Sequence, residues 1–162
     1  KDVIRFFMLI RKNDAQIDFD MQKCLEETKE NPIFYIQYAL ARINSLNEMV
    51  KEKVKNFDVF NKEIFKRFGD EELVIIKNLS LWPKVIEASV INKEPHRVVY
   101  YLIELASVMH NFWSMGKVNK ELKIINVNDL ELTHARLILL NSVSIVIRAG
   151  LDIISIKPME KM

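Results

Sequence analysis

Apolar residues recur at three- and four-residue steps along most of the chain, which is the spacing of one face of an α-helix. An almost wholly apolar stretch opens the sequence at residues 3–10, and Asn31 with Pro32 supplies a good N-cap and first-turn residue further on. The apolar stripe that follows comprises Ile36, Leu40, Ile43, Leu46 and Val50. We therefore expect a short helix buried on most sides, a second short helix capped by Asp18 or Asp20, and then a long helix.

The second half of the chain carries more of this pattern. Residues 70–81 and 83–91 predict two shorter helices, and Pro95 begins a long helix with a wide apolar face. Its two adjacent stripes are Val98, Leu102, Leu105, Met109 and Phe112, and Val99, Ile103, Ala106, His110 and Trp113. A capping box of Asn128 and Glu131 predicts the last long helix. Its stripe comprises Leu137, Leu140, Ser144, Ile147, Leu151 and Ile154.

No stretch of the chain alternates in the way of a half-buried strand, and turn-forming residues are scarce. The 162 residues include only three glycines and four prolines, far fewer than turn-rich β structure needs. We therefore expect an all-α bundle of three long and several short helices. Residues 51–68 fit either a basic loop or an irregular helical insertion that closes at Gly69. The wide spacing of the glycines also excludes the two common glycine-rich loops that bind phosphate.

The net charge and the reactive side chains, taken by themselves, exclude few classes of function. The net charge of +2 is too weak to indicate a nucleic-acid binder, although a local basic patch is compatible with it. Cys24 is the only cysteine, so an internal disulfide is impossible and a buried thiol in a reducing compartment is expected. The histidines are never paired at helical spacing. We expect no metal site and no acid–base pair for catalysis.

Tyr38 and Arg42 lie four residues apart, on one face of the first long helix. An aromatic plane beside a guanidinium can stack a base and hold a phosphate, which recognition of single-stranded RNA requires. A cation–π pair on the helix surface, or a core tyrosine, would have the same spacing. Spacing alone favours that second interpretation, and it favours a core role for Trp113 as well.

Several ordered stretches change this balance. In the first half they are DVIRFFML at 2–9, RK at 11–12, DFD at 18–20 and NPIFYIQYALARI at 31–43. In the second half they are PHR at 95–97, YL at 101–102, LA at 105–106, FW at 112–113, ARL at 135–137, GL at 150–151 and PMEKM at 158–162. Together they resemble the C-terminal part of arginyl-tRNA synthetases, the class I ligases that attach arginine to its tRNA. Four positions depart from that family's pattern: Leu40, Trp113, Ala149 and Ser155 stand where it has His, Tyr, Asn and Gly.

The resemblance implies a helical bundle of the class I synthetase anticodon-binding type, the DALR domain, over residues 29–162. It implies that residues 1–28 form the junction after a catalytic domain, and that the chain is a segment of a longer protein. Tyr38 and Arg42 would then stack and hold an anticodon base, Trp113 would be a second platform and Met162 an apolar wall. Weaker candidates, for backbone phosphates or for orienting the pocket, are Tyr35, His96, Arg97, Arg136 and Lys161.

The same resemblance implies the partners. They are an arginine-specific tRNA, bound at its anticodon arm, and the catalytic domain of the same chain, in a monomeric cytoplasmic protein with no membrane contact. The HIGH and KMSK signatures of class I catalysis do not occur. We therefore expect no cofactor and no activity in this segment, while its parent ligase uses ATP with magnesium. The alternatives are a helical protein-interaction module without RNA and, more remotely, an enzyme acting through Cys24 and a histidine.

Overall fold

The computed structural model describes residues 1–12, 15, 31–53 and 62–161, and this part of the chain is helical without a strand. The expectation of an all-α bundle is confirmed. The α-helices are α1 (Asp2–Leu9), α3 (Pro32–Lys53), α4 (Asp70–Ser80), α5 (Trp82–Ile91), α6 (His96–Val118) and α7 (Leu130–Ile153), and two short 3-10 helices are η1 (Lys62–Arg67) and η2 (Lys120–Leu122). The short helix expected near Asp18 or Asp20, and Cys24, lie outside the described residues.

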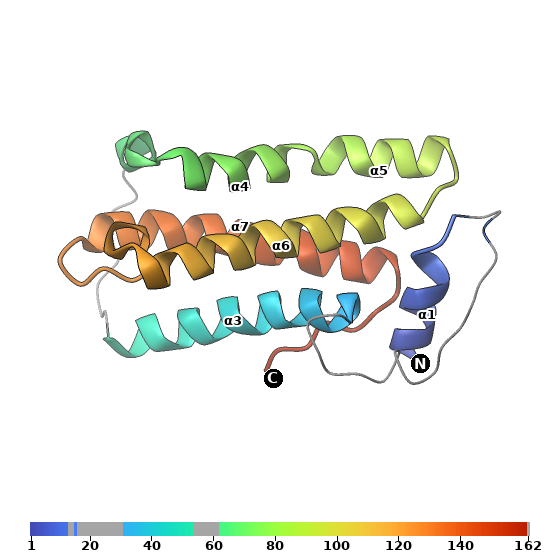
Figure 1. Ribbon diagram of the computed structural model, residues 1–162, viewed down its shortest axis with the longest axis horizontal. Helices are drawn as coiled ribbons and strands as arrows, with labels where there is room; N and C mark the ends of the chain where they lie inside the picture. The colour runs from blue at the N-terminus through green and yellow to red at the C-terminus, as the bar shows by residue number, and fades with distance from the viewer. Residues whose placement is uncertain (13–14, 16–30, 54–61, 162) are drawn as a thin grey trace.

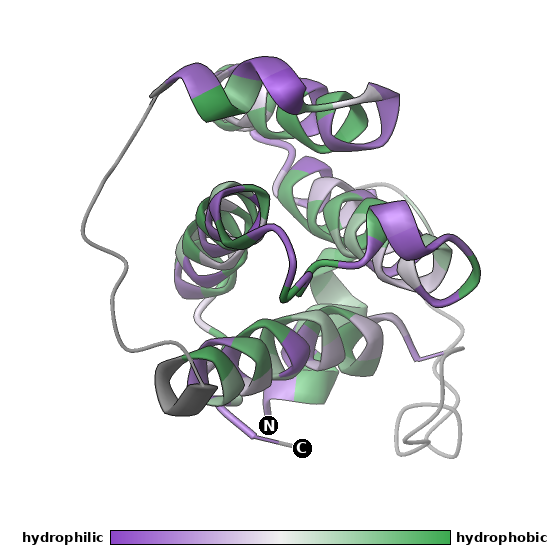
Figure 2. Cartoon of the chain, turned by 90° about the vertical axis from the view of Figure 1, so that its left-hand side faces the viewer, coloured by the Kyte–Doolittle hydropathy of each residue, from purple (hydrophilic) through white to green (hydrophobic). Residues whose placement is uncertain are grey.

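Helices α6 and α7 occupy the middle of the bundle (Figure 1). Helix α3 packs against both of them on one side, and α4 and α5 follow one another along the other side. Helix α1 lies across one end, near the start of α6. Figure 2 looks along the helices and shows them gathered around a common interior. The ends of α3 and α6 furthest from α1 lie together at the opposite end of the bundle.

The predicted apolar stripes form the core. The stripe residues of α3, the first stripe of α6 and the stripe of α7 are buried. Helices α6 and α7 come especially close at Gly150, where an added Cβ would lie 2.6 Å from a methyl carbon of Leu102. By length and composition α7 could also cross a membrane, but half of its most apolar window is buried in the bundle. That burial is typical of a core helix.

Three local expectations changed. Helix α1 is not buried on most sides, because Ile4 and Met8 are 46% and 52% exposed while only Phe6 is fully covered. Helix α7 is capped by Asp129 rather than by Asn128, since the Asp129 carboxylate accepts a hydrogen bond from the Leu132 amide at 3.1 Å. In the ambiguous segment 51–68, α3 continues to Lys53 and η1 forms a short helix; residues 54–61 lie outside the described part.

Candidate functional site

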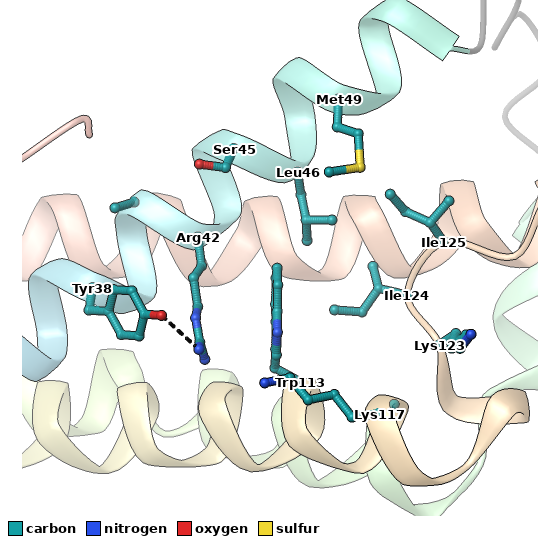
Figure 3. A pocket seen from close by; sticks show the side chains of 12 residues that line it. Tyr38, Arg42, Ser45, Leu46, Met49, Trp113, Lys117, Lys123, Ile124 and Ile125 are labelled. Atoms are coloured by element: carbon teal, nitrogen blue, oxygen red, sulfur yellow. Dashed lines mark hydrogen bonds between the residues drawn. The ribbon is translucent and has the colours of Figure 1, made fainter. Parts of the chain in front are cut away.

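A pocket of about 520 Å³ opens at the end of the bundle where α3, the end of α6 and the following loop meet. Figure 3 shows the side chains around it. Helix α3 contributes one wall, α6 the floor, and residues 123–125 the wall opposite. Its lining consists of Tyr38, Ala41, Arg42, Ser45, Leu46, Met49, Trp113, Gly116, Lys117, Lys123, Ile124 and Ile125. Three residues predicted from the sequence, Tyr38, Arg42 and Trp113, are therefore brought together.

The guanidinium of Arg42 lies between two aromatic rings. Its central carbon is 4.1 Å from the centroid of Tyr38 and 5.1 Å from that of Trp113, and its Nη2 donates a hydrogen bond of 2.8 Å to the Tyr38 hydroxyl. In Figure 3, Trp113 is seen edge-on, with Arg42 on one side and Leu46 and Ile124 on the other. The plane of Trp113 that faces away from Arg42 is thus a wall of the pocket.

The structure shows the cation–π pair that the second interpretation of the Tyr38–Arg42 spacing predicts, while stacking of a base stays a prediction. The pair is a cation–π pair, and it also lines a pocket. Because Arg42 covers one face of the Tyr38 ring, a base could stack on that face only if Arg42 moved. The open aromatic surface in this arrangement belongs to Trp113 instead.

His110 sits behind the cluster and fixes Arg42. It is 5% exposed, with Nδ1 3.1 Å from Nη1 of Arg42 and Nε2 3.1 Å from the carbonyl oxygen of Tyr35. Since arginine can only donate, Nδ1 must accept, so Nε2 carries the proton and donates to the carbonyl. His110 is therefore a neutral imidazole. The sequence assigned it only to the core, although its position three residues before Trp113 on α6 could have revealed it.

Tyr35, like His110, lies behind the pocket and is not one of its lining residues. Its ring centroid lies 4.4 Å from that of His110, while its carbonyl accepts the hydrogen bond of the imidazole. Tyr38 also approaches His110, with ring centroids 5.5 Å apart and planes 28° from parallel. The imidazole thus contacts Tyr35 and Tyr38 of α3 and positions Arg42 of the same helix.

Two exposed lysines, Lys117 and Lys123, complete the rim, and no pattern in the sequence distinguishes them from other surface lysines. Together with Arg42 they give the lining three cations. Among the described residues that line the pocket there is no carboxylate. The site therefore combines a positive rim, apolar walls and an aromatic plane, a composition suited to a flat ligand that carries negative charge. No group of three metal-binding side chains gathers among the described residues.

Arg136 does not reach the rim. Its side chain is 5% exposed and pairs with that of Glu72, 1% exposed, at 2.7 Å. Its Nη1 also donates hydrogen bonds of 2.8 Å to the carbonyl oxygens of Glu121 and Lys123. As placed, Arg136 cannot hold a phosphate at the surface, but it contacts the back of the loop that forms one pocket wall.

His96 and Arg97 lie at the other end of α6. His96 is seventeen residues and Arg97 sixteen residues before Trp113, which corresponds to roughly 25 Å along an α-helix. His96 is buried, with its ring edge-to-face to that of Tyr100, and Arg97 forms an exposed ion pair with Glu94. The structure does not bring these two candidates to the pocket.

The C-terminal tail, residues 155–161, runs along α3. The Gln37 side chain donates to the Lys157 carbonyl at 3.0 Å and accepts from the Met159 amide at 2.8 Å. Further along, Asn44 donates to the Glu160 carbonyl at 3.0 Å, and Lys161 lies 3.2 Å from Glu48. The tail thus reaches the helix that carries Tyr38 and Arg42. Met162 lies outside the described residues.

Glu160 is the main electrostatic attachment of this tail. Its carboxylate accepts a hydrogen bond of 2.8 Å from Arg148 on α7, and another of 2.9 Å from Asn44 on α3. The Arg148 hydrogen bond holds the pKa of Glu160 below its ordinary value, with a smaller contribution from Asn44. The tail is consequently fixed to two helices at neutral pH.

Comparisons with known proteins give the family and the fold that this chain resembles. A family model described as the DALR anticodon binding domain matches residues 36–162. The chain is 43% identical, over its whole length, to the arginine–tRNA ligase of Rickettsia peacockii, and spans 29% of that protein. Its fold is similar to those of arginyl-tRNA synthetases solved from Campylobacter jejuni (TM-score 0.79, 21% identity, 99% of this chain and 33% of the other) and Thermus thermophilus (TM-score 0.75, 22% identity, 99% and 26%).

Proposed function

The chain belongs to the DALR anticodon binding domain family of arginine–tRNA ligases, and on that premise we propose that the pocket beside Trp113 holds an unpaired base of the tRNA anticodon. A domain of this kind has tRNA as its partner. The rival interpretation, a helical module that binds only proteins, is not favoured by these matches. What the proposal adds is the place on the domain and the side chains that meet the base.

The observation that carries the proposal is the composition of the pocket. It presents one aromatic plane and three cations, with no carboxylate among its described lining residues. Proteins that read single-stranded RNA stack splayed bases on aromatic rings and track the backbone with positive charge. Here the base stacks on the open face of Trp113, between that ring and the apolar wall of Leu46 and Ile124. Lys117 and Lys123 at the rim meet the flanking phosphates.

Arg42 supports the stacking surface from behind, because its guanidinium lies against the face of Trp113 that points away from the proposed base. An arginine has five N–H donors, and two of its contacts are to Tyr38 and His110. These two contacts hold the guanidinium against the face of Trp113 that is opposite to the proposed base. The resemblance to the synthetase family makes the central anticodon cytosine the expected base, and the edge of that base presents two acceptors, O2 and N3. Met162 is proposed as an apolar wall.

The activity of the whole ligase is also a proposal, since the chain spans 29% of the length of its relative. We propose that the full protein attaches arginine to an arginine-specific tRNA with ATP and magnesium, as a cytoplasmic monomer. Residues 1–28 serve as the junction to its catalytic domain. The present residues contain neither the HIGH nor the KMSK signature. Alone they are expected to form no arginyl-tRNA.

The test is binding of this chain to an anticodon stem-loop carrying C, U, A or G at the central position. Uracil offers N3–H where cytosine offers an acceptor, so a pocket donor that meets N3 of cytosine loses its partner. This costs about 1–3 kcal/mol, or about 5- to 150-fold in affinity. A fully paired hairpin of the same length is the control for charge. Equal affinity for the four loops and the paired hairpin would refute the proposal.

A further inference from the structure

The buried Arg136 lies directly behind the pocket wall formed by the loop of residues 119–125, hereafter the pocket loop. We propose that Arg136 is a positioning residue for the anticodon site, holding this loop at the distance from Trp113 that a base requires. The inference rests on the proposed function, and it assigns a role to a residue that touches no ligand.

A single guanidinium joins three parts of the fold. Its Nε and Nη2 contact the carboxylate of Glu72 on α4, each at 2.7 Å, while Nη1 donates to the Glu121 and Lys123 carbonyl oxygens, each at 2.8 Å. Arg136 itself belongs to α7. The planar fork of an arginine can serve a carboxylate and separate carbonyls at once, whereas the ammonium of a lysine cannot reproduce that geometry. The two carbonyls that it binds belong to the pocket loop.

The other contacts of the pocket loop fix its remaining sides. Gly116 of α6 lies against it so closely that an added Cβ would be 2.8 Å from the Leu122 carbonyl oxygen. Ile124 is buried in the core, and the Asn119 side chain accepts a hydrogen bond of 2.9 Å from the Glu121 amide. The loop is therefore held by α6 beneath it and by Arg136 behind it. Residues 123–125 then face Trp113 across the pocket.

Arg136→Lys tests this role, with Arg97→Lys as the matched control. Arg97 also pairs with a carboxylate, but it is exposed and lies at the far end of α6. Circular dichroism establishes that each variant is folded. Hydrogen exchange is then compared between the amides of the pocket loop and those of α4 and α7, and affinity is measured with the cytosine stem-loop.

We expect Arg136→Lys to lose protection in the pocket loop while α4 and α7 keep theirs. Its affinity should fall by about 10- to 100-fold, the range seen when a residue that orients metal ligands is lost. Arg97→Lys should match the wild type in both measurements. Asn119→Ala, an exposed change that loosens the same loop from outside, should reduce loop protection and affinity in the same direction but to a smaller extent.

If Arg136→Lys does not fold, the double variant Glu72→Gln/Arg136→Gln takes its place. It removes both charges together, so no unpaired charge stays buried, and a glutamine oxygen at position 72 can still accept from the Gly69 amide. This double variant should likewise lose protection in the pocket loop and affinity for the stem-loop, while α4 and α7 keep their protection.

Two results would overturn the inference: wild-type loop protection and affinity in the folded variant, or protection lost equally from the loop, α4 and α7. The second would make Arg136 a general stabiliser of the core. If the wild-type chain binds no stem-loop, the proposed function fails, while loop protection still decides separately whether Arg136 holds the loop.

Discussion

Replacing Trp113 by leucine removes the flat surface of the pocket and keeps an apolar side chain. Stacking of a base on an aromatic ring contributes about 1–3 kcal/mol, so affinity for the anticodon stem-loop should fall about 5- to 150-fold. The upper part of this range is expected if Arg42 also shifts, because Trp113 is one of the two rings around its guanidinium. Trp113→Phe keeps a plane and should retain most of the affinity.

The chain supplies a matched control in Trp82. Trp82 is likewise half-buried, and it packs against the ring of Tyr101 at 5.2 Å, on α5 and away from the pocket. Affinities of the Trp113→Leu and Trp82→Leu variants are measured by fluorescence anisotropy of a labelled stem-loop, together with their urea denaturation curves. The reasoning is refuted if Trp113→Leu binds as the wild type does, or if Trp82→Leu weakens binding to the same extent.

Three further perturbations address the rim, the loop and the tail. The slope of log affinity against log salt is negative, and Lys117→Ala and Lys123→Ala should each make it less negative by about 0.7, the value for one phosphate of a single strand. An unchanged slope would exclude the phosphate contact. Gly116→Ala should lower the free energy of unfolding, measured in urea, by about 1–3 kcal/mol through overpacking, because the added Cβ would meet the backbone of the pocket loop. Alanine in place of glycine normally stabilises a helix, so a gain in stability would contradict this prediction. Because the folded-state pKa of Glu160 is lowered, its contribution to holding the tail is complete above the ordinary glutamate pKa and is lost as pH falls through the lowered value. In the wild type, the tail amides should lose protection from hydrogen exchange in that pH range. Glu160→Gln should show no such pH-dependent loss.

The helices could be predicted from the sequence because each carries its own periodic pattern and N-terminal signal. Tyr38 and Arg42 could be paired from their spacing, since residues four apart on a helix are neighbours whatever surrounds them. Trp113 became a candidate only through the resemblance to a known family. Its position opposite α3 depends on how α3 and α6 pack, and no local pattern contains that information.

The remaining parts of the site depend on contacts between distant positions. Arg136 looks like a surface cation in the sequence, and Glu72, its buried partner, is 64 residues away. Lys117 and Lys123 become rim residues because the pocket loop folds back against the end of α6. The exposure of Ile4 has a similar origin, since an apolar stretch shows only that its residues could be buried, and not that the rest of the bundle covers them.

The buried pair of Glu72 and Arg136 restricts how this domain can diverge. Changing either residue alone strands a charge in the interior, at a cost of about 3–5 kcal/mol, a large share of the stability of an ordinary domain. Even if both residues were replaced by apolar ones, the two loop carbonyls that Arg136 binds would lose their hydrogen-bond donor. Positions 72 and 136 should therefore covary among relatives, and lineages that lose the pair should carry another donor facing the same carbonyls.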